Sequence, residues 1–75
     1  MTDFDKLESI MKKSGATIAS ISMAAGFTRE TYYNRKRGMG EFTAREIKAI
    51  SEVLRLTPDE REQIFFAPDV TVSNT

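Results

Sequence analysis

Apolar residues recur at helical spacing in five short stretches of the chain, and glycine, proline or small polar residues separate the stretches. In the first stretch, Phe4, Leu7, Ile10 and Met11 follow the spacing that places side chains on one face of a helix. We therefore expect a helix over residues 3–13 that ends at Gly15.

Two more helices are predicted on either side of Gly26. Residues 18–25 are small or apolar, and Gly26 stands where a helix would end in the left-handed conformation that glycine adopts at little cost. Thr28 can cap the next helix, because its hydroxyl can accept a hydrogen bond from a free amide at the helix start. The chain should therefore end one helix, bend and begin another within three residues. A plain helical hairpin would show the same glycine and the same cap.

The second half of the chain predicts two further helices, each with its own start signal. Residues 38–40 (Gly-Met-Gly) end the third helix. Thr43 followed by Glu46 forms a capping box, and Thr57 repeats that pattern with Pro58 at the first helical position. We expect the apolar residues of these two helices to face inward, namely Ile47, Ile50, Val53, Leu54, Ile64 and Phe65.

Length and composition limit the class of protein. A chain of 75 residues makes one domain with a thin core, which we place at residues 1–66. Residues 67–75 lack periodicity, and we expect them to be disordered or bound to a partner. The chain has no cysteine, no stretch long enough to span a membrane and no signal-peptide pattern. We expect a cytoplasmic protein of all-α class that does not bind membranes.

Charge is distributed unevenly, although the net charge is zero. Residues 1–40 contain seven basic and four acidic residues, a net charge of +3, whereas residues 41–75 contain four and seven, a net charge of −3. The basic residues gather near the third predicted helix. This asymmetry would let the first part of the chain face phosphate while the acidic part points away.

The sequence offers no chemistry for catalysis. It has no histidine, no cysteine and no glycine-rich phosphate loop, so we find no plausible nucleophile, general base pair or metal cluster. We expect no enzyme activity, cofactor, metal ion or small-molecule substrate.

Three stretches of the chain, taken in order, resemble lambda-repressor-like helix-turn-helix proteins of the Cro/repressor type. They are TIASISMAAGFT at residues 17–28, TYYNRKRG at 31–38 and EFTAREIKAISEVLRLTPDEREQIFF at 41–66. The resemblance is strongest to the short regulators of phages and prophages in Gram-positive bacteria. It implies a compact five-helix domain that regulates transcription, with the third helix in the major groove of operator DNA.

The resemblance assigns DNA contacts to the third predicted helix. Residues at the start of such a helix reach base edges, and residues at its end meet phosphates. Arg29 could read guanine with a bidentate fork, and Glu30 could accept from cytosine. The expected contacts are Thr28, Arg29, Glu30, Thr31, Tyr33, Asn34, Arg35 and Arg37, with Lys12 and Lys13 as further phosphate contacts, while Tyr32 matches a buried position. Compensation of the helix dipole would also place basic residues at the helix end.

Two positions differ from the family pattern. Ile18 stands where the family usually has a glutamine that binds a backbone phosphate, and Lys36 stands where a buried leucine is common.

The second helix also carries an unusually apolar outer side, formed by Ile18, Ala19, Ser20, Met23 and Ala24, and exposed apolar strips often mark protein contacts. Packing of Ile18 and Met23 on neighbouring loops would equally explain that side.

Two functions remain open at this point. We expect a Cro-like or repressor-like regulator that binds an inverted repeat in double-stranded DNA as a homodimer. The alternative is a modulator or antirepressor of the same fold that binds a phage repressor protein instead of reading DNA.

Overall fold

In a computed structural model that describes residues 1–67, each helix begins immediately after a polar capping residue. The helices are α1 (Phe4–Ser14), α2 (Ile18–Ala25), α3 (Arg29–Lys36), α4 (Ala44–Leu54) and α5 (Pro58–Phe65). The part of the chain that the structure describes contains no strand, so the all-α class is confirmed.

The caps explain why the helices begin where they do. The side chains of Asp3, Thr17, Thr28, Thr43 and Thr57 each accept a hydrogen bond from the amide three residues further on. Such caps satisfy amides that have no partner within the helix. The capping boxes predicted at Thr43 and Thr57 are confirmed, and a third box, between Thr17 and Ser20, was not predicted.

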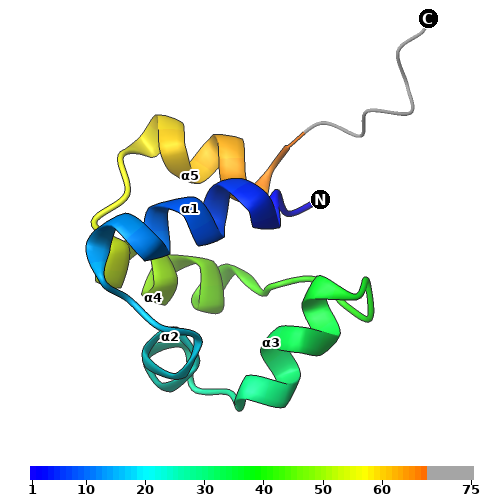
Figure 1. The fold of residues 1–75 in the computed structure, drawn as a ribbon. Coiled ribbons are helices and arrows are strands. Elements are labelled where there is room, and N and C mark those ends of the chain that lie inside the picture. Colours follow the sequence, from blue (N-terminus) through cyan, green and yellow to red (C-terminus); the bar gives the residue numbers. More distant parts are fainter. Residues whose placement is uncertain (68–75) are drawn as a thin grey trace, which may run out of the picture.

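Gly26 ends α2 as predicted. Its φ of 83° lies in the left-handed region, and the amides of Gly26 and Phe27 both donate to the carbonyl of Ser22, at 2.9 and 3.0 Å. Figure 1 shows the result: α2 is seen almost end-on, while α3 runs across the lower right of the view, so the two helices cross steeply.

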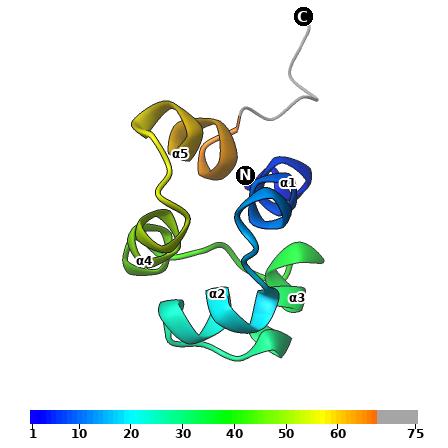
Figure 2. The same cartoon turned by 60° about the vertical axis from the view of Figure 1, so that its left-hand side comes forward.

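The five helices form two groups in space. Close packing joins α1 to α4 and α5, and joins α2 to α3 and α4. Figure 2 shows α5 at the top, α4 on the left, α1 on the right and the α2–α3 pair at the bottom. Because α3 packs closely only on α2, it lies at the edge of the molecule.

An aromatic cluster fills the space between α3 and the other helices. Phe42, in the loop before α4, lies at its centre, with ring centroids 5.8 Å from Phe4, 5.9 Å from Phe27 and 5.8 Å from Phe65. The sequence analysis assigned no role to Phe42. The buried apolar residues as a whole are Leu7, Met11, Ile21, Tyr32, Phe42, Ile50, Leu54, Ile64 and Phe65.

Val53 does not face inward, and this prediction was wrong. Its side chain is 46% exposed, whereas Ile50, Ser51 and Leu54 are buried on α4. At about 100° of rotation per residue, Val53 lies roughly 110° from the middle of that buried stripe. The small side chain of Ser51 takes the position that faces the core instead.

Both ends of the described chain are joined through the backbone. The Asp3 amide donates to the Ile64 carbonyl at 2.6 Å, and the Ala67 amide donates to the Met1 carbonyl at 3.1 Å. The expectation for the tail, residues 67–75, falls almost wholly outside the described residues. None of the helices within residues 1–67 has the length and apolar character that crossing a membrane requires.

Candidate functional site

The start of α3 is held by two threonines that the sequence analysis placed at DNA. The Thr28 hydroxyl accepts from the Thr31 amide at 3.2 Å, and the two hydroxyl oxygens lie 3.2 Å apart. These hydroxyls therefore fix the first turn of the helix. Thr28 itself stays exposed, whereas Thr31 is half-buried.

The outer face of α3 is polar and exposed. Tyr32 is the one buried residue of this helix, while Arg29, Glu30 and Tyr33 are exposed along its length. Tyr33 is 43% exposed, and its ring meets the Tyr32 ring edge-on at a centroid distance of 5.7 Å. Arg29, Glu30 and Tyr33 thus lie on one outward face of α3, whereas Thr31, which was also expected to read bases, is half-buried.

Arg35 points toward α4 and not toward that face. Its Nη1 atom lies 2.6 Å from Oε1 of Glu46 and donates to the Glu41 carbonyl at 2.8 Å. The guanidinium also lies over the Phe42 ring, 5.5 Å from its centroid. Partial burial raises the pKa of Glu46, but hydrogen bonds from Arg35 and Thr43 outweigh this effect, so its pKa lies below the ordinary value. Arg35 thus joins α3 to α4.

Lys36 joins α3 to α1 through Glu8. The Lys36 ammonium lies 2.9 Å from Oε2 and 3.0 Å from Oε1 of Glu8, and the Tyr32 hydroxyl donates to the same Oε2 at 2.7 Å. Burial and the neighbouring Glu8 carboxylate raise the pKa of Tyr32. Burial also acts to raise the pKa of Glu8, but the two donors prevail and lower it. The sequence analysis did not identify Glu8 as part of the site.

Internal pairing reduces the positive charge that α3 presents to solvent. Arg35 and Lys36 are both engaged in ion pairs, whereas Arg37 is exposed and donates to the side chain of Asn34. Asn34 is half-buried. The outward face therefore carries Arg29 and Arg37 against Glu30, a net charge of only +1.

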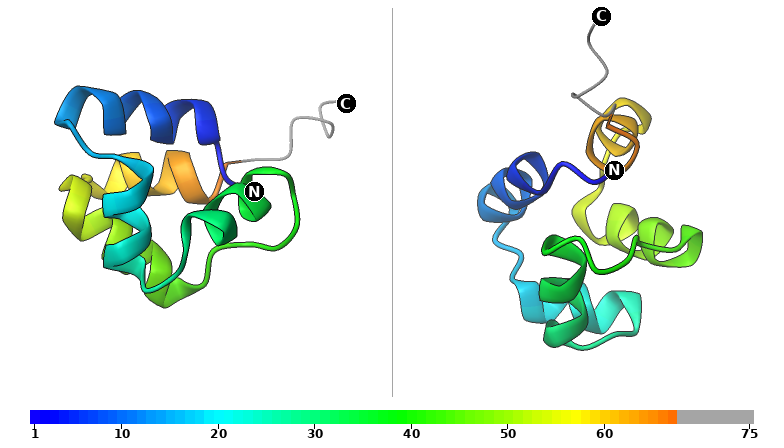
Figure 3. Two further views of the ribbon diagram at one scale, coloured as in Figure 1. Left: turned by 60° about the horizontal axis from the view of Figure 1, so that its bottom comes forward. Right: turned by 90° about the vertical axis from the view of Figure 1, so that its right-hand side faces the viewer.

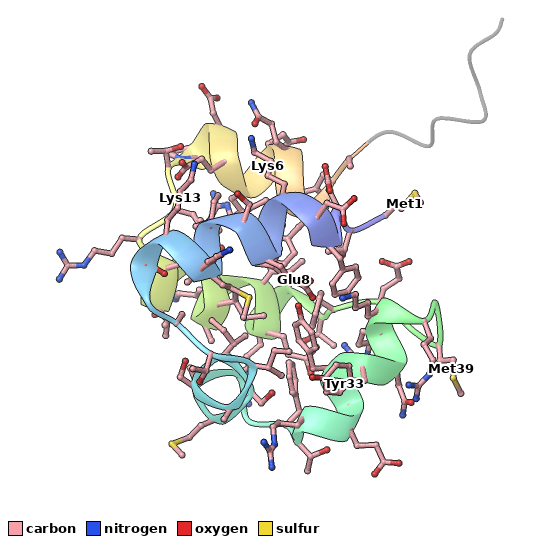
Figure 4. The ribbon with its side chains drawn as sticks, in the orientation of Figure 1. Met1, Lys6, Glu8, Lys13, Tyr33 and Met39 are labelled. Carbon is pink, nitrogen blue, oxygen red and sulfur yellow. The ribbon has the colours of Figure 1, made fainter. Side chains whose placement is uncertain are left out.

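Lys12 and Lys13 are in the last turn of α1, and both are exposed. In Figure 4, Lys13 lies at the end of α1 that is remote from Tyr33. These lysines are therefore separated from the outward face of α3.

The outer side of α2 is smaller than the sequence suggested. Ile18 is half-buried and packs against the core, so it is not part of an exposed strip. Ala19, Ser20 and Ala24 are exposed, and Met23 is 82% exposed. The Ser20 hydroxyl is engaged in the capping box with Thr17, at 3.0 and 2.9 Å. Met23 is thus the main apolar side chain that α2 presents to solvent.

Within residues 1–67, no group of three or more histidine, cysteine or acidic side chains lies close enough together to hold a metal ion. Comparison of the chain with family models, with curated proteins and with solved structures found no match.

Proposed function

We propose that this chain is a lambda-repressor-like helix-turn-helix protein that regulates transcription by placing α3 in the major groove of operator DNA. The observation that carries this proposal is the character of α3. It buries only Tyr32 and presents Arg29, Glu30 and Tyr33 outward. Exposed hydrogen-bonding side chains at the start of a helix are the groups that read base edges in the major groove.

The dimensions of α3 suit this role. Its eight residues span about 12 Å, and a helix with its side chains is about 10–12 Å wide. The major groove of B-form DNA is about 12 Å wide and admits one α-helix. The steep crossing with α2 leaves the outer side of α3 uncovered by any other helix, at the lower right of Figure 1, which supports the same placement.

Base reading would come from the first turns of α3. Arg29 would donate two hydrogen bonds to guanine, Glu30 would accept from cytosine, and Tyr33 would contact a sugar or a thymine methyl group. Arg37, at the helix end, would meet a phosphate. Arg35 is left out of the proposed interface because its guanidinium is bound to Glu46.

As a homodimer, the protein would bind an inverted repeat whose half-sites lie about 34 Å apart, one turn of the DNA helix. Each phosphate contact contributes roughly −0.9 to the slope of log affinity against log salt. With Arg35 and Lys36 paired internally, we expect a shallower salt dependence than the basic cluster in the sequence indicates.

Selection from a pool of randomised duplexes, followed by fluorescence anisotropy at two salt concentrations, tests the proposal. Arg29→Ala should relax the preference at one base pair by about 1–3 kcal/mol. Arg37→Ala should weaken binding to all sequences about equally and flatten the salt slope. Arg61→Ala, which removes an exposed arginine on α5, is the matched control and should leave the base preference unchanged.

Failure to enrich any duplex with a folded protein would overturn the proposal. Equal loss on all sequences from Arg29→Ala and Arg37→Ala would instead remove Arg29 from base reading.

A second candidate function rests on α2. This helix has no charged residue, and Met23 is 82% exposed on it, which favours contact with another protein. On this reading, the chain is a modulator or antirepressor that binds a phage repressor. Binding to a panel of repressor DNA-binding domains would then be abolished by Met23→Glu and retained by Tyr33→Glu. The reverse pattern would exclude the α2 surface.

A further inference from the structure

We infer that Glu8, on α1, is a positioning residue for α3: it sets the rotation of α3 about its own axis and thereby the direction of Arg29, Glu30 and Tyr33. The inference rests on the proposed function for its consequence in DNA reading. The contacts that carry it involve α3 and its neighbours alone.

The first support is the way in which one carboxylate binds two donors on α3. Tyr32 and Lys36 are four residues apart, about one helical turn, and both donate to Glu8, at 2.7 and 2.9 Å. Figure 4 shows Glu8 between α1 and α3. Two donors bound to one carboxylate restrain both the roll and the tilt of the helix, since either motion changes the geometry of at least one hydrogen bond.

The second support is that few side chains of α3 reach the core: the Tyr32 ring packs against Phe4 and Phe42, at centroid distances of 5.6 and 6.3 Å, and the remaining inward contacts of the helix are polar. The helix packs closely only on α2, and Tyr32 is its one buried side chain. On the opposite flank, Arg35 binds Glu46 of α4 at 2.6 Å. The helix is therefore held between two carboxylates, Glu8 on one side and Glu46 on the other.

The size of the effect follows from helix geometry. A side chain whose tip lies about 6 Å from the helix axis moves by about 1 Å when the helix rolls by about 10°. A recognition site needs its groups held within about 0.5 Å. A small roll, too small to disturb the core, would thus misplace Arg29 and Tyr33 against base edges.

Electrostatics gives this role a signature of its own. Glu8 is an anion on α1 beside α3, and it pairs with Lys36. If Glu8 and Lys36 affected DNA binding only through their charges, removing Glu8 should strengthen binding to all DNA and removing Lys36 should weaken it. If the pair positions α3, either change should reduce the discrimination between operator and random DNA.

The experiment compares the dissociation constants for the selected operator and for a random duplex, at one salt concentration. The variants are Glu8→Gln and Lys36→Met, and Glu62→Gln on α5 is the control, because it makes the same chemical change at an exposed position. Circular dichroism first sets a temperature at which every variant is folded.

Discrimination is the dissociation constant for the random duplex divided by that for the operator. We expect Glu8→Gln and Lys36→Met each to lower this ratio about tenfold, the equivalent of one base contact. Affinity for the random duplex should rise in Glu8→Gln and fall in Lys36→Met, while the control keeps the wild-type ratio. The double variant Glu8→Lys with Lys36→Glu, which reverses the ion pair, should restore most of the wild-type discrimination. An unchanged ratio in both single variants would overturn the inference, even if both melt at lower temperature.

A second measurement separates this inference from the proposed function. If the wild-type protein selects no duplex, the DNA-reading proposal fails, and amide hydrogen exchange of Glu8→Gln decides the role of Glu8. Faster exchange confined to α3 would support positioning by Glu8. Equal acceleration in α3, α4 and α5 would overturn it, because Glu8 would then contribute only to global stability.

Discussion

The helices α2 and α3 are both eight residues long and both begin at a threonine cap, but different forces hold them. The helix α2 has no charged residue, buries Ile21 and Ser22, and packs on both α3 and α4. The helix α3 has four charged residues and buries only Tyr32. The left view of Figure 3 shows α2 in front of α4, with α3 to the right of both.

This difference separates stability from orientation. Apolar burial is strong but has no preferred direction, whereas hydrogen bonds and ion pairs weaken when their geometry changes. Substitutions at the buried face of α2 should therefore lower the free energy of unfolding. Substitutions at the polar contacts of α3 should chiefly change where its outer face points.

The largest effect should come from the core side of α2. Ile21 is fully buried, so Ile21→Ala should lower the free energy of unfolding by about 3 kcal/mol, through lost burial and the cavity left behind. Urea unfolding measures this free energy. Met23→Ala, on the exposed side of the same helix, should change it by less than about 0.5 kcal/mol. Equal losses from the two variants would contradict the division of α2 into a core face and a solvent face.

A smaller effect is expected at the anchor of α3. Tyr32→Phe removes only the hydroxyl that donates to Glu8 at 2.7 Å and should cost about 1 kcal/mol in the free energy of unfolding. Tyr33→Phe, the same change on the neighbouring exposed tyrosine, should cost nothing measurable. If the two variants unfold at the same urea concentration, the hydroxyl of Tyr32 contributes nothing to the stability of the domain.

The sequence predicted the helix boundaries well because their causes are local. Thr43 and Thr57 cap through residues three positions away, and Gly26 needs only its own backbone freedom. Such signals are complete within a few residues. They require no knowledge of which helices pack together.

The inward contacts of Arg35 and Lys36 could not be predicted in this way. Their acidic partners lie 11 and 28 residues away in the chain, and a basic helix end looks the same in sequence whether it is paired or exposed. Ile18 and Val53 show a related limit. Both sit at the edge of an apolar stripe, where the neighbouring helices decide which residues are covered. The DNA contacts assigned to Arg29 and Glu30 stay predictions.

The turn between α2 and α3 offers a third test, with an expected loss of stability similar to that of Tyr32→Phe. Gly26 has a φ of 83°, and an added Cβ would meet nothing within 4 Å. Gly26→Ala should therefore cost about 1 kcal/mol through backbone strain alone. Gly15→Ala is the matched control, since Gly15 has a φ of 78° and equally open surroundings. Both variants should lose similar stability, but only Gly26→Ala should alter operator preference. A change in preference from Gly15→Ala would show that strain anywhere in the chain disturbs α3.

The smallest effect should appear as the pH falls. The pKa values of Glu8 and Glu46 lie below the ordinary value of 4.5, because their hydrogen-bond donors outweigh partial burial. A carboxylate whose pKa is lower in the folded state contributes stability that is fully present above its unfolded pKa, near pH 4.5. That stability is lost as the pH falls through the folded value.

The helix α2 contains no ionisable side chain, so acid should loosen α3 before it loosens α2. As the pH is lowered from about 6 to about 3, the protection factors of the amides, which correct for the slower intrinsic exchange in acid, should fall first in α3. The double variant Glu8→Gln with Glu46→Gln should already exchange faster in α3 at the higher pH and change less on acidification, whereas Glu62→Gln should follow the wild type. Simultaneous loss of protection in α2 and α3 would mean that the two carboxylates stabilise the whole domain, and that α3 has no separate restraint for acid to release.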